Sequence, residues 1–288
     1  MSQSPVQAPR HVERISLRQE GALQLSGRTA TVVGVCHHGL YPGRVPNQDA
    51  VLVVDGRGFL GAFVADGLGG YKNGALGSHV VLESLELNLR DADLTPANTP
   101  EQLRAMLETA RGRMREARVG DGGTTLVGII AFEDGAACCV HCGDSRAQRV
   151  SGAQVAALTR DHNKVQEQHV PEWIAQGRST GELVTHEDGN ILRAFVGQKH
   201  PPERLDIFLL DPPLSPGDLL FLSSDGLDWV DDLPRARYED NRETITRLAA
   251  LDDAGFTEAL SPEGIRRAGG KGADNLSVLR IRWRGLTT

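Results

Sequence analysis

The stretch FLGAFVADGLGG at residues 59–70 does most to decide the fold, because an apolar run ends there on a carboxylate and glycines. The run predicts a buried strand, which leaves Asp66 at the strand tip. Gly67, Gly69 and Gly70 have no side chain, so a backbone carbonyl or a ligand can come close to them. An Asp-Gly pair is also a common turn. This stretch by itself therefore leaves a turn and a cation site as alternatives.

Three further aspartates repeat the arrangement at distant points of the chain. Asp225 follows an apolar run and precedes Gly226. Asp274 opens the last apolar run, and Asp49 stands directly before the run at 50–54. Four carboxylates beside four predicted strands indicate that they converge on one cleft. Carboxylate oxygens without a cluster of thiols or imidazoles suit hard divalent ions such as Mg²⁺ or Mn²⁺.

Converging carboxylates repel one another unless a cation neutralises them. Two ions roughly 3.5–4 Å apart can share a water and lower its pKa enough to form hydroxide near neutral pH. Arg44, five residues before Asp49, offers a planar guanidinium that binds phosphate through two hydrogen bonds. A surface ion pair is the alternative explanation for this arginine.

Periodicity predicts antiparallel sheets covered by helices. Apolar residues at helical spacing predict helices at 73–90 and 103–117, with further helical patterns at 238–268. The polar stretch 161–205 is expected to leave the sheets, with one short helix at 165–176. Apolar or alternating runs predict strands at 30–36, 50–54, 59–65, 125–132, 136–142, 147–150, 155–158, 218–223 and 276–283.

Composition excludes several classes of protein. The 288 residues allow one large or two small domains. The net charge of −7 argues against non-specific binding to nucleic acid. The first residues lack the apolar core of a signal peptide, and no apolar run approaches the ~20 residues that span a bilayer. We therefore expect a cytoplasmic protein with neither a membrane nor a nucleic-acid partner.

The cysteines do not predict disulfides or a metal site. Three of the four crowd one predicted strand, which is poor geometry for a disulfide framework and fits a reducing compartment. Cys139 and Cys142 form a CxxC, but His141 alone does not supply the second ligand pair that zinc requires. Buried strand cysteines that act as small apolar residues are the favoured interpretation.

Seven short motifs follow one another along the chain, namely RVPNQD (44–49), ADGLGG (65–70), GGTT (122–125), GDSR (143–146), LTRDH (158–162), SSDGL (223–227) and ADN (273–275). In order and spacing this set resembles the signature blocks of the metal-dependent Ser/Thr protein phosphatases, the PPM or type 2C family. The resemblance covers about residues 30–283. DGLGG and the segment NILRAFVG at 190–197 are more similar to the compact bacterial members than to the eukaryotic ones.

The resemblance implies an α+β fold, a four-layer α-β-β-α sandwich of two antiparallel sheets flanked by helices, with a dinuclear metal cleft between the sheet edges. A single phosphatase domain would occupy residues 28–288, with a flap subdomain at about 164–205. Residues 1–27 would form an N-terminal arm or extension, although they could also supply an edge strand.

The same resemblance assigns metal ligands. Asp66 would bridge two Mn²⁺ or Mg²⁺ ions, and the carbonyl of Gly67 would bind one of them. Asp225 and Asp274 would hold the other ion's side. Asp49 would reach a metal directly or through water, and would take part in catalysis.

Two further residues complete the implied site. Asp144 would serve a third, weaker ion. Arg44 would act in catalysis by clamping the phosphoryl group of the substrate.

Some positions depart from the family pattern. Gln48 is neutral where the family is usually acidic, and Trp229 replaces an aspartate, with Asp228 just before it. These changes leave the third metal site open. Leu68 replaces a histidine that could protonate the leaving alcohol in eukaryotic members. A water on the metals could replace that acid, as could one of three histidines, His37, His38 and His162.

The implied function is hydrolysis of phosphoserine and phosphothreonine on proteins by in-line attack of a metal-bridging hydroxide. The partners would be phosphorylated substrates of a Hanks-type bacterial kinase, and the chain would act as a monomer. A catalytically weak or inactive relative that binds a phosphoprotein or another partner is the alternative, allowed by Gln48 but opposed by the four retained aspartates. A calcium-stabilised module ranks last, because no loop alternates oxygen ligands within about 12 residues.

Overall fold

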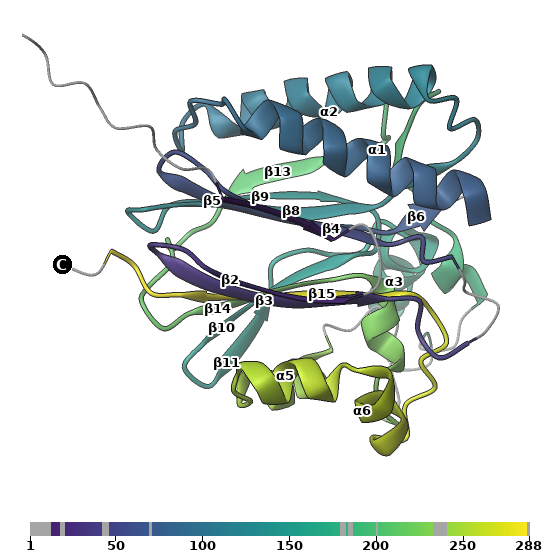
Figure 1. Cartoon of the computed structure of the whole chain (residues 1–288). Coiled ribbons are helices and arrows are strands. Elements are labelled where there is room, and N and C mark those ends of the chain that lie inside the picture. The colour runs from purple at the N-terminus through teal and green to yellow at the C-terminus, as the bar shows by residue number, and fades with distance from the viewer. Residues whose placement is uncertain are drawn as a thin grey trace, which may run out of the picture.

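A computed structural model describes residues 13–17, 21–41, 46–68, 71–178, 183, 187–199, 201–232 and 241–286. Two six-stranded sheets lie face to face, and all their strand pairs are antiparallel (Figure 1). The first sheet has the spatial order β1 (Glu13–Leu17), β4 (Ala50–Asp55), β5 (Phe59–Ala65), β8 (Leu126–Phe132), β9 (Ala137–Cys142) and β13 (Asp206–Leu209). The second has the order β11 (Gln154–Ala157), β10 (Arg146–Ser151), β14 (Leu219–Ser223), β15 (Leu276–Trp283), β3 (Ala30–His37) and β2 (Gly21–Ser26).

Helices cover both outer faces of this pair of sheets. The long helices α1 (Tyr71–Leu89) and α2 (Thr99–Glu116) lie over the first sheet (Figure 1). The second sheet is covered from the other side by α4 (Arg242–Ala249), α5 (Asp253–Ala259) and α6 (Pro262–Arg267). The fold is therefore the expected α+β sandwich of helix, sheet, sheet and helix.

Three layers of apolar side chains hold the sandwich together. In β4, Leu52 and Val54 pack toward α1 and α2, whereas Val51 and Val53 pack between the two sheets. A strand that is covered on both faces must be apolar at nearly every position, which explains the unbroken apolar runs of β4, β5 and β8. The third layer joins β14, β15 and β3 to the C-terminal helices.

The stretch before residue 28, expected as an arm or an edge strand, contributes strands to both sheets. β1 pairs with β4 along Glu13–Asp55 to Leu17–Val51, and β2 pairs with β3. Residues 13–17 and 21–26 therefore belong to the sandwich as edge strands, which is one of the two alternatives that the sequence left open for this stretch. Short edge strands carry a weak sequence signal, because only part of each strand is buried.

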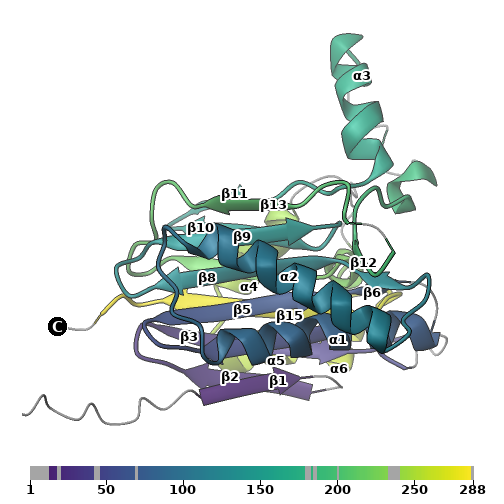
Figure 2. The same cartoon turned by 90° about the horizontal axis from the view of Figure 1, so that it is seen from above.

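The described residues at 164–178, 183 and 187–195 lie outside the two large sheets, as the polar composition of this part predicts. A π-helical turn (Val165–His169) leads into α3 (Val170–Ala175), which projects away from the sheets (Figure 2). A 3₁₀ helix follows at Glu187–Asn190. The segment then returns through β12 (Val196–Gly197), which joins a small third sheet with β7 (Gly123–Thr124) and β6 (Gly67–Leu68).

Candidate active site

The first predicted carboxylate, Asp66, stands between β5 and β6 and is held through its backbone. Its N–H donates to the Thr125 hydroxyl at 3.0 Å, and its carbonyl accepts from the Thr125 N–H at 2.8 Å. The Thr124 hydroxyl donates to the same carbonyl at 2.8 Å. The GGTT motif therefore fixes the strand end that carries Asp66.

Asp49, which directly precedes the neighbouring strand β4, is fully buried. The Ser224 hydroxyl donates to Oδ2 of Asp49 at 2.7 Å, and Ser224 in turn accepts from the Ser277 N–H at 3.0 Å. Oδ1 of Asp49 is also buried, yet no described residue donates a hydrogen bond to it. Ser224 thus orients Oδ2 of this carboxylate, whereas Oδ1 has no hydrogen-bond donor among the described residues.

The remaining motifs meet at the same end of the sandwich. The Gln48 N–H donates to Oδ1 of Asn275 at 2.9 Å, which joins the RVPNQD motif to the ADN motif. A Cβ on Gly226 would lie 1.9 Å from the Asn275 carbonyl oxygen, so only glycine fits after Asp225. Gly67 is equally constrained, because its Cβ would lie 2.2 Å from the carbonyl oxygen of Gly74 on α1. The glycines of the motifs permit these close backbone approaches.

The raised pKa values of the predicted carboxylates indicate that they lie close to one another. Burial raises the pKa of Asp66 well above its usual value, and the charges of Asp49, Asp225, Asp144 and Asp274 raise it further. Burial likewise raises the pKa of Asp225, and Asp144 and Asp274 are the largest charged causes. The pKa of Asp49 and that of Asp144 both rise to about 7, again mainly through burial. The structure therefore brings together five of the predicted aspartates.

These residues fit divalent cations on two observations. Oδ1 of Asp225, like Oδ1 of Asp49, is buried without a hydrogen-bond partner in the part of the chain that the structure describes. The donor set consists of carboxylate oxygens and the nearby Gly67 carbonyl, which are ligands for Mg²⁺ and Mn²⁺. Ordinary buried carboxylates are hydrogen-bonded or ion-paired, so carboxylate oxygens without a described donor are candidates to bind a cation. Arg44 lies outside the described residues, and its assigned role stays a prediction.

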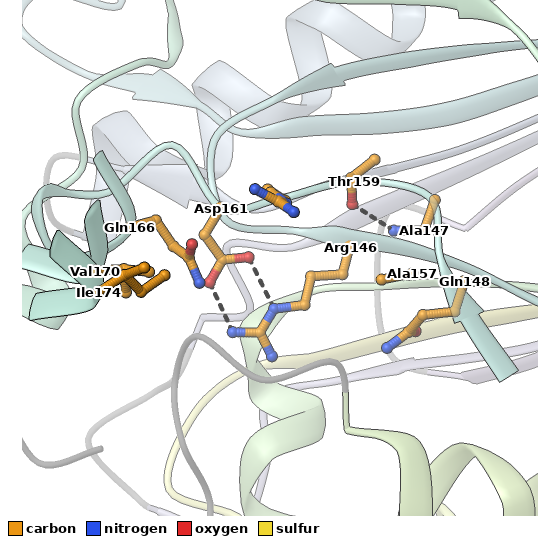
Figure 3. Close-up of a pocket in the computed structure, with 10 residues that line it drawn as sticks. Arg146, Ala147, Gln148, Ala157, Thr159, Asp161, Gln166, Val170 and Ile174 are labelled. Carbon is orange, nitrogen blue, oxygen red and sulfur yellow. Dashed lines mark hydrogen bonds and ion pairs between the residues drawn. The ribbon is translucent and has the colours of Figure 1, made fainter. Parts of the chain in front are cut away.

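A buried ion-pair network next to Asp144 was not singled out from the sequence. Arg146 donates to both oxygens of Asp161 at 2.8 and 2.7 Å, and its Nη1 donates to Asp228 at 3.0 Å. Figure 3 shows this guanidinium facing the Asp161 carboxylate. Both residues line a pocket of about 360 Å³, together with residues of β10 and β11. The motifs GDSR and LTRDH already contained Arg146 and Asp161, but nothing in their spacing showed that they pair.

The network also includes the acidic residue next to Trp229, the position where the family usually has an aspartate. Asp228, the carboxylate beside it, is bound by Arg146 and accepts from Asn241 at 2.5 Å. It is therefore neutralised by the protein rather than left for a cation.

Two of the histidines that could replace the missing general acid have structural partners. Nε2 of His37 lies 2.9 Å from the Leu260 carbonyl oxygen, and Nδ1 accepts from the Gly39 N–H at 3.0 Å. His162 is bonded to Gly143 and Asp206. For His38, the backbone carbonyl accepts from Asn275 at 3.3 Å, which ties the ADN motif to the end of β3.

The cysteines are free and buried, as the favoured interpretation predicts. Burial raises the pKa of the Cys138 thiol to about 11 and that of Cys142 to about 12. A thiol that stays protonated at neutral pH is a poor nucleophile. The cysteines therefore take no part in a covalent mechanism.

The family model for protein phosphatase 2C matches residues 43–261, and the chain belongs to this family. The class of protein is therefore protein phosphatase 2C, and the sandwich with its acidic strand ends is consistent with that class.

Individual relatives agree with this assignment. The protein phosphatase PhpP of Streptococcus pneumoniae is 30% identical over 224 residues, which cover 72% of this chain and 86% of that protein. The fold is similar to that of the Streptococcus agalactiae serine/threonine phosphatase, with a TM-score of 0.71 at 23% identity over 88% of this chain and 99% of that one. The catalytic domain of the phosphatase PstP, in complex with 2 manganese ions, has a TM-score of 0.63 at 26% identity, over 89% and 99% of the two chains.

Proposed function

We propose that this chain hydrolyses phosphoserine and phosphothreonine on proteins with two divalent ions, Mn²⁺ or Mg²⁺, and a third, weaker ion at Asp144. The observation that carries the proposal is the pair of buried oxygens, one on Asp49 and one on Asp225, that have no hydrogen-bond donor in the described structure. Both belong to a cluster of carboxylates whose pKa values are raised by burial and by one another.

Each residue of the cluster has a distinct task in this proposal. Asp66 would bridge the two ions, with the Gly67 carbonyl on one of them and Asp225 and Asp274 on the other. Asp49 would reach a metal through Oδ1, because Ser224 already binds Oδ2. When bound, the pair of ions lowers the pKa of a shared water and so supplies the nucleophile near neutral pH.

The rest of the chain would handle the phosphoryl group. Arg44 would clamp it through two charge-assisted hydrogen bonds, which orients the phosphorus for in-line attack. The mechanism would use no cysteinyl intermediate, because the thiols are buried and burial raises their pKa. A water or His38 would protonate the leaving alcohol, because Leu68 cannot and the rings of His37 and His162 are engaged elsewhere.

The test uses p-nitrophenyl phosphate and a phosphothreonine peptide with the full-length chain. We expect turnover with Mn²⁺, and its loss in a chelator. Arg44→Ala should mainly raise the KM, since phosphate binding is partly shared by ground state and transition state. If the protein binds Mn²⁺ yet cleaves neither substrate, the proposal fails, and the inactive, partner-binding relative replaces it.

In the cell, we place the chain opposite a bacterial Ser/Thr kinase, acting as a monomer on the proteins that the kinase phosphorylates. The support is the family, together with relatives that are named serine/threonine phosphatases. A phosphoproteome comparison between a deletion strain and its parent tests this placement. Phosphosites that rise in the deletion strain would be the expected substrates, and an unchanged phosphoproteome would contradict it.

A further inference from the structure

A second cluster of titratable side chains lies beside the turn that carries Asp144. His141 on β9, His162 from the loop after β11, and Asp206 at the start of β13 have ligand atoms within 4.8 Å of one another. His141 and Asp206 are cross-strand partners in the first sheet, whereas His162 arrives from the second. Because β13 and β11 are edge strands, the cluster bridges the two sheets along one open edge of the sandwich.

The hydrogen bonds of His162 define its protonation state. The Gly143 N–H donates to Nδ1 at 3.3 Å, so the single ring proton of a neutral imidazole lies on Nε2. Nε2 is 3.0 Å from Oδ2 of Asp206 and donates to it. His162 and Asp206 therefore form a hydrogen-bond relay that ends on the backbone of Gly143.

Residue 162 binds both polar backbone groups of Gly143. Besides the bond to the ring, the His162 N–H donates to the Gly143 carbonyl at 2.7 Å. Gly143 has a φ of +113°, and a Cβ there would lie 2.7 Å from the Cβ of Thr125, which itself binds the backbone of Asp66. The turn is thus fixed on one side by the Asp66 strand end and on the other by His162, with Asp144 directly after it.

Asp206, at the far end of the relay, is held in place as a charged carboxylate. Asp206 also accepts from Arg204 at 3.2 Å; although burial opposes the shift, the bonds from Arg204 and His162 hold its pKa below the usual value. The ring of His141 lies 4.3 Å from that of His162 and is fully buried. Burial lowers the pKa of His141 to about 3, so a neutral ring shields the relay from water.

We propose that His162, oriented by Asp206, is a positioning residue that sets the Asp144 carboxylate for the weakest-bound divalent ion. This inference rests on the proposed function, which gives Asp144 its metal. Asp161, the preceding residue, holds the other end of the same turn through Arg146 at 2.7 Å. The adjacent residues Asp161 and His162 therefore hold the turn from Gly143 to Arg146 at both ends. Metal-ligating carboxylates are commonly oriented by such hydrogen bonds from residues around them.

The test counts bound Mn²⁺ by electron paramagnetic resonance of the free ion, so it needs no turnover. The wild-type chain should show two tighter ions and one weaker ion, and Asp144→Asn should remove the weaker one. We expect His162→Asn and Asp206→Ala each to raise the Kd of the weaker ion about 10-fold or more, with the tighter ions unchanged. Asp206→Asn should restore much of the affinity, because its amide oxygen still accepts from Nε2.

Asp218→Ala is the matched control, because it removes another buried, arginine-paired aspartate far along the same sandwich. It should lower the Tm without changing the weaker Kd. Hydrogen exchange of the metal-free protein provides a second readout, since the backbone at 143–146 should exchange faster in His162→Asn than in the control.

Three results have different consequences. A weaker Kd within twofold of wild type in both relay variants would overturn the positioning role and leave the proposed function standing. A wild-type chain with only two ions would also overturn the positioning role; it would remove the third ion from the proposed function and leave hydrolysis with two ions standing. If the wild type binds no Mn²⁺ at all, the proposed function itself fails.

Discussion

The two ends of β14 carry aspartates in opposite situations. At the start of the strand, Asp218 accepts from Arg149, from the Ser151 hydroxyl and from the Ser215 N–H. Although burial opposes it, these donors hold the pKa of Asp218 below its usual value. Just past the other end of the strand, Asp225 keeps a buried oxygen without a donor from any described residue, and its pKa is well above the usual value.

The contrast shows that the chain can neutralise a buried carboxylate, whereas no described residue binds the free oxygens of Asp49 and Asp225. Arg146 even reaches the edge of that end, but it pairs with Asp161 and Asp228 rather than with Asp225. A strand end that only needed a stable turn would resemble Asp218. The unbalanced charge around Asp225 is therefore a cost in stability that a bound cation would remove.

The largest expected effect comes from removing one charge at the acidic end. Asp225→Asn should lower turnover of a phosphopeptide by on the order of 10³-fold, as does the loss of a group that stabilises developing charge. Steady-state kinetics with saturating Mn²⁺ measures the loss, and circular dichroism checks that the variant folds. Wild-type rates in a folded variant would remove Asp225 from the site.

Breaking the ion pairs of Arg146 with Asp161 and Asp228 is expected to lower the free energy of unfolding. Arg146→Met leaves Asp161 and Asp228 buried without their cation, which should cost about 3–5 kcal/mol of unfolding free energy. Denaturation in urea measures this cost. A loss below about 1 kcal/mol would mean that the two carboxylates find other partners.

A smaller loss is expected at the start of β14. Asp218→Asn keeps the shape of the side chain but gives up the charge that Arg149 binds, so about 1–3 kcal/mol should be lost. Catalysis should not change in the same variant once it is folded. A selective loss of turnover would show that the two ends of β14 are coupled.

The smallest expected effect is a pH-dependent difference in Tm between an Asp49 variant and the wild type, measured on the metal-free protein. The pKa of Asp49 rises from 3.8 to about 7 on folding, so between these values the folded state holds the proton more tightly, and stability falls as the pH rises. Asp49→Asn removes this penalty. In a chelator the variant should therefore gain Tm at pH 8 and gain less at pH 5.

The difference between variant and wild type is the quantity to measure. Buried neutral histidines such as His37 and His141 have lowered pKa values, so their contribution to stability changes with pH in the opposite sense. Subtraction at each pH cancels them. An equal Tm difference at pH 5 and pH 8 would show that the Asp49 carboxylate is not penalised by folding.

Several features of the molecule could be predicted from local sequence. The unbroken apolar runs gave β4, β5 and β8, because strands covered on both faces must be apolar throughout. Helical spacing gave α1 and α2 to within a few residues. The motifs selected Asp49, Asp66, Asp144, Asp225 and Asp274, which the fold does bring together.

Other features depend on contacts between distant segments. β13 is a four-residue, partly exposed edge strand, and it is recognisable only beside β9. Arg280 continues the alternation of β15, yet it is buried because it donates to the Leu251 carbonyl at 2.8 Å. No pattern of spacing predicts such a partner.

The sequence by itself determined which carboxylates stand at strand ends, because strand tips and glycines are set by residues close in the chain. Only the tertiary structure decided which of the buried carboxylates are neutralised and which are not. Asp161, Asp218 and Asp228 meet a guanidinium from another strand, whereas Asp49 and Asp225 each keep an oxygen that no described residue binds. Electrostatic balance depends on distances across the fold, and that balance separates a structural aspartate from a candidate metal ligand.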